Sequence, residues 1–165
     1  MRLERILPGG RIHVMVNLSE DEFRTYHGPD CATVHRTSGA VLGGPSSHAT
    51  VIDTRKQRCL VTVDFKLGGA RPFFSDPLGG ARDQLVDLDQ LCGRDGAVLR
   101  ERLLDAGTPE AMFQVLETVL LKQLVDPETP DPAMPFAARA LERGVPGVRD
   151  IEMANQMPSF FVALI

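Results

Sequence analysis

The amino-acid sequence predicts an α+β protein, in which an antiparallel β-barrel or sandwich is followed by a helical hairpin and short C-terminal helices. Residues 1–74 contain short runs of alternating apolar and polar residues, separated by Gly, Pro and Asp at turns. Residues 95–124 instead place their apolar side chains at helical spacing. The change between the two patterns falls where a strand ends in Gly68-Gly69 and Pro72 follows.

That strand shows the clearest alternation in the sequence. Its two faces are Cys59, Val61, Val63 and Phe65 on one side, and Arg58, Thr62 and Asp64 on the other. Leu60 interrupts the polar side, which suggests that this side is partly covered as well. We therefore expect one buried face with Cys59 in the core.

The N-terminal part predicts several further strands. Met1–Leu7 leads into the turn Pro8-Gly9-Gly10 and then into a strand from Arg11 to Leu18, so the two are expected to form a hairpin. The second strand alternates between two sets: Ile12, Val14, Val16 and Leu18 against Arg11, His13, Met15 and Asn17. Shorter strands are expected at 23–27, near Thr33 within a loop at 28–39, at 40–42 and at 49–52.

The later part predicts two antiparallel helices. A short helix is possible at 83–91, and a helix at 95–106 is closed by Gly107. Thr108-Pro109-Glu110 then restarts the chain as a helix, with Thr as the N-cap and Pro in the first turn. The apolar stripe of this second helix packs either on the barrel or on the same stripe of a second chain.

The C-terminal part begins with a Pro-rich linker. Three prolines lie between Asp126 and Pro132. Short helices are expected at 135–143 and 148–155, and the chain ends in an apolar tail at 159–165.

Composition limits the function class. The net charge of -4 argues against a surface that binds nucleic acid throughout, and the three cysteines form no CxxC pair. Without a secretion signal or an apolar run of about 20 residues, the protein is expected to be cytoplasmic and not bound to a membrane.

Catalytic and metal-binding motifs are not indicated. The four histidines, His13, His27, His35 and His48, lack the short spacing that presents two imidazoles to one ion. Ser46-Ser47-His48 is better explained as a turn than as a nucleophile and its base, and the Gly-Gly pairs as turn formers than as phosphate loops. We therefore expect no enzyme activity, no cofactor and no metal. His13, Met15 and Asn17 share one strand face and are the candidate pocket residues.

The order of these segments resembles the N-terminal sensor region of AraC-type bacterial transcription regulators. The matching segments are Arg5–Arg11, Val16–Leu18, Val41–Pro45, Val63–Ala70 and the Leu-rich helical hairpin. The resemblance covers nearly all of residues 1–124. It implies a cupin-like barrel that binds a small-molecule effector, a helical region used for homodimerisation, and a C-terminal pair of helix-turn-helix units that bind promoter DNA.

The resemblance divides the chain into four parts. They are a cupin-like β sensor domain at 1–75, a helical hairpin for packing or dimerisation at 76–125, the linker at 126–134 and a partial helix-turn-helix region at 135–165. Arg149 and Ser159 are the candidate DNA contacts. Residues 145–165 contain one Arg against Asp150 and Glu152, so DNA binding is expected to belong to a longer form with a second helix-turn-helix unit.

Two alternatives remain open from the sequence. The chain could be a stand-alone cupin-like module that binds a small molecule, with no role on DNA. It could also be a metal-dependent cupin enzyme, which would contain bound iron, manganese or zinc after purification.

Overall fold

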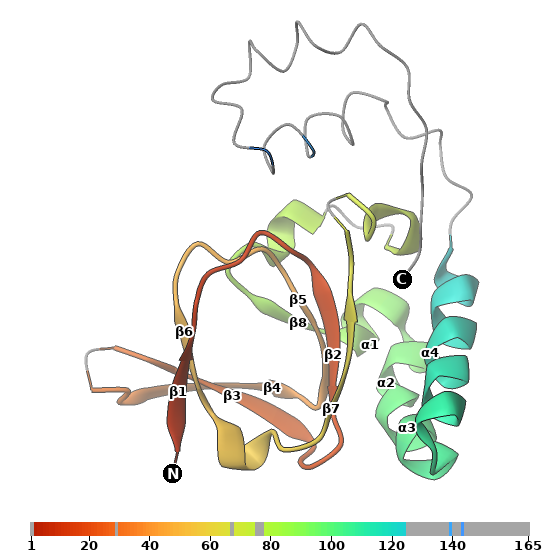
Figure 1. The fold of residues 1–165 in the computed structure, drawn as a ribbon, viewed down its shortest axis with the longest axis horizontal. Coiled ribbons are helices and arrows are strands. Elements are labelled where there is room, and N and C mark those ends of the chain that lie inside the picture. The colour runs from red at the N-terminus through yellow and green to blue at the C-terminus, as the bar shows by residue number, and fades with distance from the viewer. Residues whose placement is uncertain are drawn as a thin grey trace, which may run out of the picture. The chain divides into compact units, whose positions relative to one another are not determined.

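Two four-stranded antiparallel sheets and a layer of helices make up residues 2–28, 30–66, 68–74 and 78–124, which the computed structural model describes together with residues 139 and 143 (Figure 1). The chain divides into two units, Met1–Asp126 and Pro127–Ile165, and every element below belongs to the first. The predicted linker, the partial helix-turn-helix region, Arg149 and Ser159 lie outside the described residues.

The first sheet, which we call the distal sheet, contains strands from the N-terminal half. Its order is β1 (Leu3–Ile6), β6 (Thr50–Asp53), β3 (Glu22–His27) and β4 (Thr33–Ser38). The second, which we call the central sheet, has the order β7 (Leu60–Asp64), β2 (His13–Asn17), β5 (Ala40–Gly43) and β8 (Leu85–Asp87). The predicted α+β fold with antiparallel sheets is therefore confirmed.

The helical layer follows the sheets in sequence. It consists of α1 (Leu88–Cys92), α2 (Arg94–Ala97), α3 (Leu99–Ala106) and α4 (Pro109–Gln123). Short 3₁₀ turns at Thr54–Lys56 (η1), Arg71–Phe73 (η2) and Leu78–Ala81 (η3) join the strands and helices. In Figure 1 the helices lie beside β2 and β7, on the side away from β1 and β6.

The turn between α3 and α4 forms as its residues predict. Gly107 ends α3 in the left-handed conformation, with φ of 69°. The side chain of Thr108 then accepts a hydrogen bond from the backbone N–H of Ala111 at 3.3 Å, and Pro109 is the first residue of α4. Leu103, Leu116 and Val119 on this hairpin are buried in the core.

The predicted hairpin of the first two strands is wrong. β1 pairs with β6, and β2 pairs with β5 and β7, so the chain crosses from one sheet to the other at Pro8-Gly9-Gly10. Turn residues show that a strand ends, but they do not show which strand is its partner. Both edges of β2 are taken by strands that are distant in sequence.

Three further local predictions need correction. Leu85–Asp87 is a strand rather than part of a helix, because it pairs with β5 and its Asp87 accepts a hydrogen bond from the backbone N–H of Ser38 at 2.8 Å. The helix expected at 95–106 is divided at Val98 into α2 and α3. Cys59 is exposed rather than in the core, because it precedes the first residue of β7.

Candidate functional site

The central sheet has one face that packs on the helices. Val14 on β2 lies opposite Leu42 on β5 and Val63 on β7. All three belong to or pack against the main hydrophobic core, which also contains Leu99 and Leu116 from the helices. A residual cavity of only about 10 Å³ lies between Val14 and residues of α1, α2 and α4. This face is therefore a closely packed interface with the helical layer.

The opposite face of the same strands carries the predicted pocket residues. Side chains alternate along a strand, so His13 and Met15 point away from the face of Val14 that packs on the helices. In Figure 1, β1 and β6 of the distal sheet lie on the other side of β2 from the helices. Their partners across the ladder share this face, and we call the set the barrel-facing surface: His13, Met15, Val41, Gly43, Thr62 and Asp64. Val41 is fully buried, whereas Thr62 and Asp64 are exposed. The surface is thus reached from solvent along β7.

His13 is held against a glycine. A Cβ atom at Gly43 would lie 2.3 Å from Nε2 of His13, so only glycine leaves room for the ring in this position. Burial lowers the pKa of His13, and the negative charge of Asp64, its partner on β7, opposes this effect. The imidazole is therefore predominantly neutral at neutral pH.

Asn17 differs from the other two predicted pocket residues, because its side chain is fully hydrogen-bonded within the protein. Its Nδ2 donates to the backbone carbonyls of Glu22 and Lys56, both at 2.9 Å. Its Oδ1 accepts from the backbone N–H groups of Ser19 at 3.0 Å and Glu20 at 3.2 Å. The amide thus joins the end of β2 to η1, and contact with an effector would require breaking one of these bonds.

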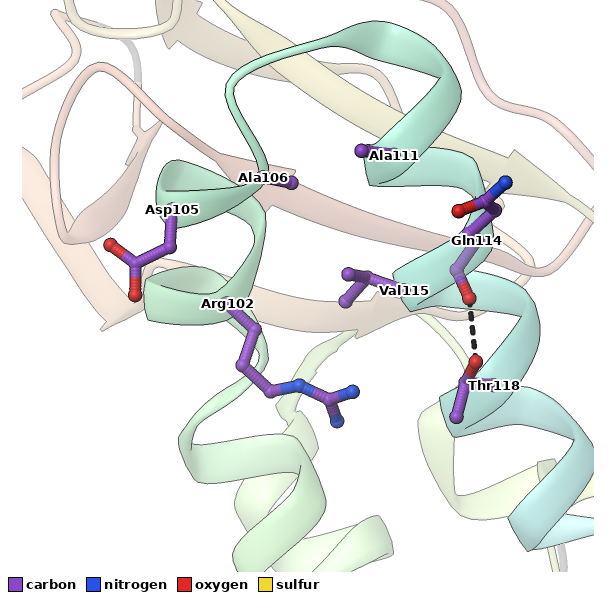
Figure 2. A pocket seen from close by; sticks show the side chains of 7 residues that line it. All are labelled: Arg102, Asp105, Ala106, Ala111, Gln114, Val115 and Thr118. Atoms are coloured by element: carbon purple, nitrogen blue, oxygen red, sulfur yellow. Dashed lines mark hydrogen bonds between the residues drawn. The ribbon is translucent and has the colours of Figure 1, made fainter.

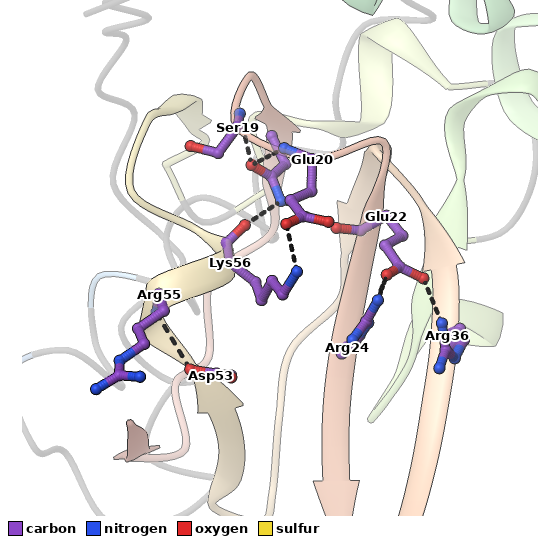
Figure 3. A network of polar contacts seen from close by, with 9 residues as sticks. Ser19, Glu20, Glu22, Arg24, Arg36, Asp53, Arg55 and Lys56 are labelled. Carbon is purple, nitrogen blue, oxygen red and sulfur yellow. Dashed lines mark hydrogen bonds and ion pairs between the residues drawn. The ribbon is translucent and has the colours of Figure 1, made fainter. Parts of the chain in front are cut away.

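Charged side chains surround the turn at residues 18–21, which follows β2 (Figure 3). Lys56 pairs with Glu20 at 2.5 Å, and Glu22 accepts from both Arg24 and Arg36. The hydrogen bond from Arg24 is the main cause of the lowered pKa of Glu22. These groups are partly or largely exposed, and exposed pairs contribute little to stability. These ion pairs therefore mark the position of the turn but contribute little to its stability.

Arg100 links the helical layer to the same turn. Its Nε donates to the backbone carbonyl of Asn17 at 2.7 Å and lies 3.5 Å from Oδ1 of Asp21. A Cβ atom at Gly39 would lie 2.9 Å from Cδ of Arg100, so the guanidinium stem passes close to the backbone there. This hydrogen bond therefore connects α3 directly to the last residue of β2.

Ser47, His48 and Asp83 form an exposed cluster that resembles a catalytic triad only in composition. Oγ of Ser47 lies 2.9 Å from each carboxylate oxygen of Asp83 and 2.9 Å from Nδ1 of His48. In a triad the histidine stands between the acid and the nucleophile, whereas here the carboxylate accepts from the serine directly. Nδ1 of His48 lies near both groups, 3.6 Å from Oδ1 of Asp83. The backbone N–H of Ser47 also donates to Asp83 and is the main cause of its lowered pKa. These hydrogen bonds connect the loop that contains Ser47 to the loop that contains Asp83.

A groove of about 390 Å³ runs between α3 and α4 (Figure 2). Its lining residues are Arg102, Asp105, Ala106, Ala111, Gln114, Val115 and Thr118. Figure 2 shows the side chain of Arg102 extending into the space between the two helices, and Oγ1 of Thr118 donates to the backbone carbonyl of Gln114 at 2.7 Å. The small side chains of Ala106 and Ala111 leave the groove open.

A comparison with protein-family models matches residues 1–87 to a domain of unknown function, DUF6597. The chain belongs to the DUF6597 family. The match ends at Asp87, the last residue of β8, so it spans both sheets and the barrel-facing surface. Searches of curated proteins and of solved structures found no match to the chain.

Within the DUF6597 domain, sequence reasoning found part of the barrel-facing surface. His13 and Met15 were identifiable because they alternate with Val14 and Val16. Thr62 and Asp64 were identifiable as the polar side of their own strand, but not as partners of Met15 and His13. Strand pairing between residues this distant in sequence leaves no local signal.

No helix in the described part of the chain has both the length and the apolar character needed to cross a membrane. Among residues 2–28, 30–66, 68–74 and 78–124, no three His, Cys, Asp or Glu side chains gather as metal ligands would.

Proposed function

We propose that this DUF6597 chain is the effector-sensing and dimerisation part of an AraC-like transcription regulator. The observation that supports this most directly is the division of the central sheet. One face is fixed to a helical layer, and the other presents His13, Met15, Thr62 and Asp64 on a surface that solvent reaches. A sensor needs both a ligand surface and a rigid connection to the element that responds.

The connection in this proposal is β2. The strand carries His13 and Met15 on its barrel side and Val14 and Val16 on its helix side. Arg100 adds a polar link from α3 to the end of the strand. A ligand that shifts β2 therefore acts on side chains that pack directly against the helices.

We assign dimerisation to the α3–α4 hairpin, with a second copy of this chain as the partner. Two apolar residues of α4 are exposed, Phe113 by 63% and Leu121 by 58%, and so is the C-cap residue Leu124, by 43%. Opposite charges accompany them, since Arg102 lies in the groove and Glu117 lies on α4, and neither forms an ion pair with another described residue. Two copies packed through this face would cover the apolar side chains and pair these charges.

DNA recognition in this proposal belongs to a longer form of the protein. The resemblance to AraC-type regulators implies that Arg149 and Ser159 belong to a partial helix-turn-helix region, and residues 145–165 carry too few cations to neutralise DNA phosphates. The test is a gel-shift experiment with the longer gene product and its own promoter region. Lack of retardation at low salt would contradict the regulator assignment.

Effector sensing is tested by ligand screening on the purified chain. A library of small metabolites is added, and the rise in thermal unfolding temperature identifies ligands that bind the folded state. The variant Met15→Trp fills the barrel-facing surface and should abolish the shift. Val34→Ser, at an exposed position on β4, is the control and should respond as the original chain does.

The dimer is tested by size-exclusion chromatography with light scattering. We expect the chain to elute as a dimer and Phe113→Asp to elute as a monomer, because the charge would be placed within an apolar interface. The control Leu60→Asp changes an exposed leucine of β7 and should leave the dimer intact. A monomeric original chain would contradict the dimer.

A further inference from the structure

The carboxylate of Asp64 lies on the barrel-facing surface without an ionic or hydrogen-bonding partner among the described residues. Asp64 is exposed at the end of β7, next to β2 in the ladder. Within residues 2–28, 30–66, 68–74 and 78–124, no cation forms an ion pair with it and no side chain donates a hydrogen bond to it. Its negative charge is therefore available to a ligand.

The residue beside it does not neutralise this charge. His13 lies directly across the ladder from Asp64, and its ring is held over Gly43. Since burial favours the neutral ring, the pair carries a net charge of about -1 at neutral pH. A neutral imidazole also offers one nitrogen as a hydrogen-bond acceptor. Both groups thus favour a ligand that donates hydrogen bonds.

An apolar area lies on the same face. Met15 is the next residue but one along β2, and its partner Val41 on β5 is fully buried. Methionine contacts aromatic rings favourably through its sulfur atom. The surface therefore combines an anionic end at Asp64 and His13 with an apolar end at Met15.

We infer that the barrel-facing surface binds a small cationic ligand, a protonated amine or amidinium attached to an apolar or aromatic body. The cationic group donates hydrogen bonds to the carboxylate of Asp64 and to the ring of His13, and the body lies against Met15. This inference rests on the proposed sensor function and specifies the class of effector. Anionic ligands are disfavoured, because their charge would lie beside a carboxylate that forms no ion pair with a described residue.

The inference is tested with matched probes that share one aromatic body. These are 2-phenylethylamine, the neutral 2-phenylethanol and the anionic 3-phenylpropionate, each titrated into the purified chain by calorimetry. A hydrogen bond to a charged group corresponds to a preference of about tenfold or more, so we expect the amine to bind at least about tenfold more tightly than either of the others. The ring signals of His13 in NMR spectra should shift with the amine.

Matched variants test whether the carboxylate of Asp64 is the group that binds the amine. Asp64→Asn should reduce amine binding by about tenfold or more and leave alcohol binding unchanged. Asp30→Asn makes the same change at an exposed position between β3 and β4 and should have no effect on either probe. Thermal unfolding of both variants shows that they remain folded.

Several results would overturn the inference. They are tighter binding of the anionic probe, equal amine binding by the original chain and Asp64→Asn, or no detectable binding of any probe. Each of these leaves the sensor proposal to be decided by the library screen and Met15→Trp. If the screen finds only ligands without a cationic group, the sensor proposal stands and the present inference fails.

Discussion

The two faces of β2 differ in kind, although they are made by adjacent residues of one strand. Val14 and Val16 are 2% and 0% exposed and pack against helices. His13 and Met15 are partly exposed and face the other way. Fully burying a valine contributes about 1.5–3 kcal/mol, so the helix-facing side supports the fold. His13 and Met15 make a smaller contribution and are free to serve ligand binding.

The helical layer lies on the face of the central sheet that has the apolar side chains. Helices cover the apolar face of the central sheet and leave the polar face open along β7. A change on the helix side is therefore expected to affect stability first. A change on the barrel side is expected to affect the local surface first.

The largest effect is expected from Leu103→Ala on α3. Leu103 is 0% exposed and belongs to the core that joins the helices to the central sheet. Removing its side chain leaves a cavity, and we expect a loss of about 2–5 kcal/mol in the free energy of unfolding, measured with urea. The adjacent Leu104, 45% exposed, is the control. An equal loss for Leu104→Ala would contradict the helix-facing core.

Asn17→Ala should follow with a loss of about 3 kcal/mol. The substitution leaves two backbone carbonyls and two backbone N–H groups without their side-chain partner, and each unsatisfied buried group costs about 1–3 kcal/mol. Urea unfolding measures the loss. Ser19→Gly, which removes a single side-chain hydrogen bond to Cys59, should lose less. A stability of Asn17→Ala equal to that of the original chain would show that Asn17 does not hold the turn.

Gly43→Ala tests the barrel side and should cost only about 1 kcal/mol. The new methyl group meets the far end of a side chain, the ring of His13, which can move aside. We expect the ring to leave its place over the strand, visible as a shift of the His13 signals in NMR spectra. The double variant Gly43→Ala, His13→Ala should recover the lost stability, and failure to do so would mean that the ring is not the obstacle.

The smallest effect is the pH dependence of His13. Its pKa is lowered in the folded protein, so the unfolded chain binds the proton more readily. Stability should therefore be complete above the ordinary histidine value of about 6.5 and decrease as the pH falls from there toward the lowered folded value. Urea unfolding of the original chain and His13→Gln at several pH values measures this. An identical pH dependence in both proteins would contradict the burial of the ring.

Part of the fold and of the candidate site could be predicted from the sequence. The alternation at His13–Asn17 and at Leu60–Asp64 identified both strands and the residues that share each face. Gly107 and Thr108 identified the turn between the helices. These signals are local, because strand periodicity and helix caps depend on neighbouring residues. Two predictions were wrong because strand pairing depends on a distant partner: the hairpin of β1 and β2, and the helical assignment of residues 85–87 within the short helix predicted at 83–91. The burial of Cys59 was also wrong, because this residue precedes the first residue of β7 and is exposed.

By itself, the sequence determined the two-part α+β order of the chain and the division of β2 into an apolar and a polar face. The tertiary structure decided which face meets the helices, that β7 places Asp64 beside His13, and that Arg100 reaches the carbonyl of Asn17. The physical reason is that alternation fixes which side chains lie together on a strand. What covers each face is set by packing between segments that are distant in the chain.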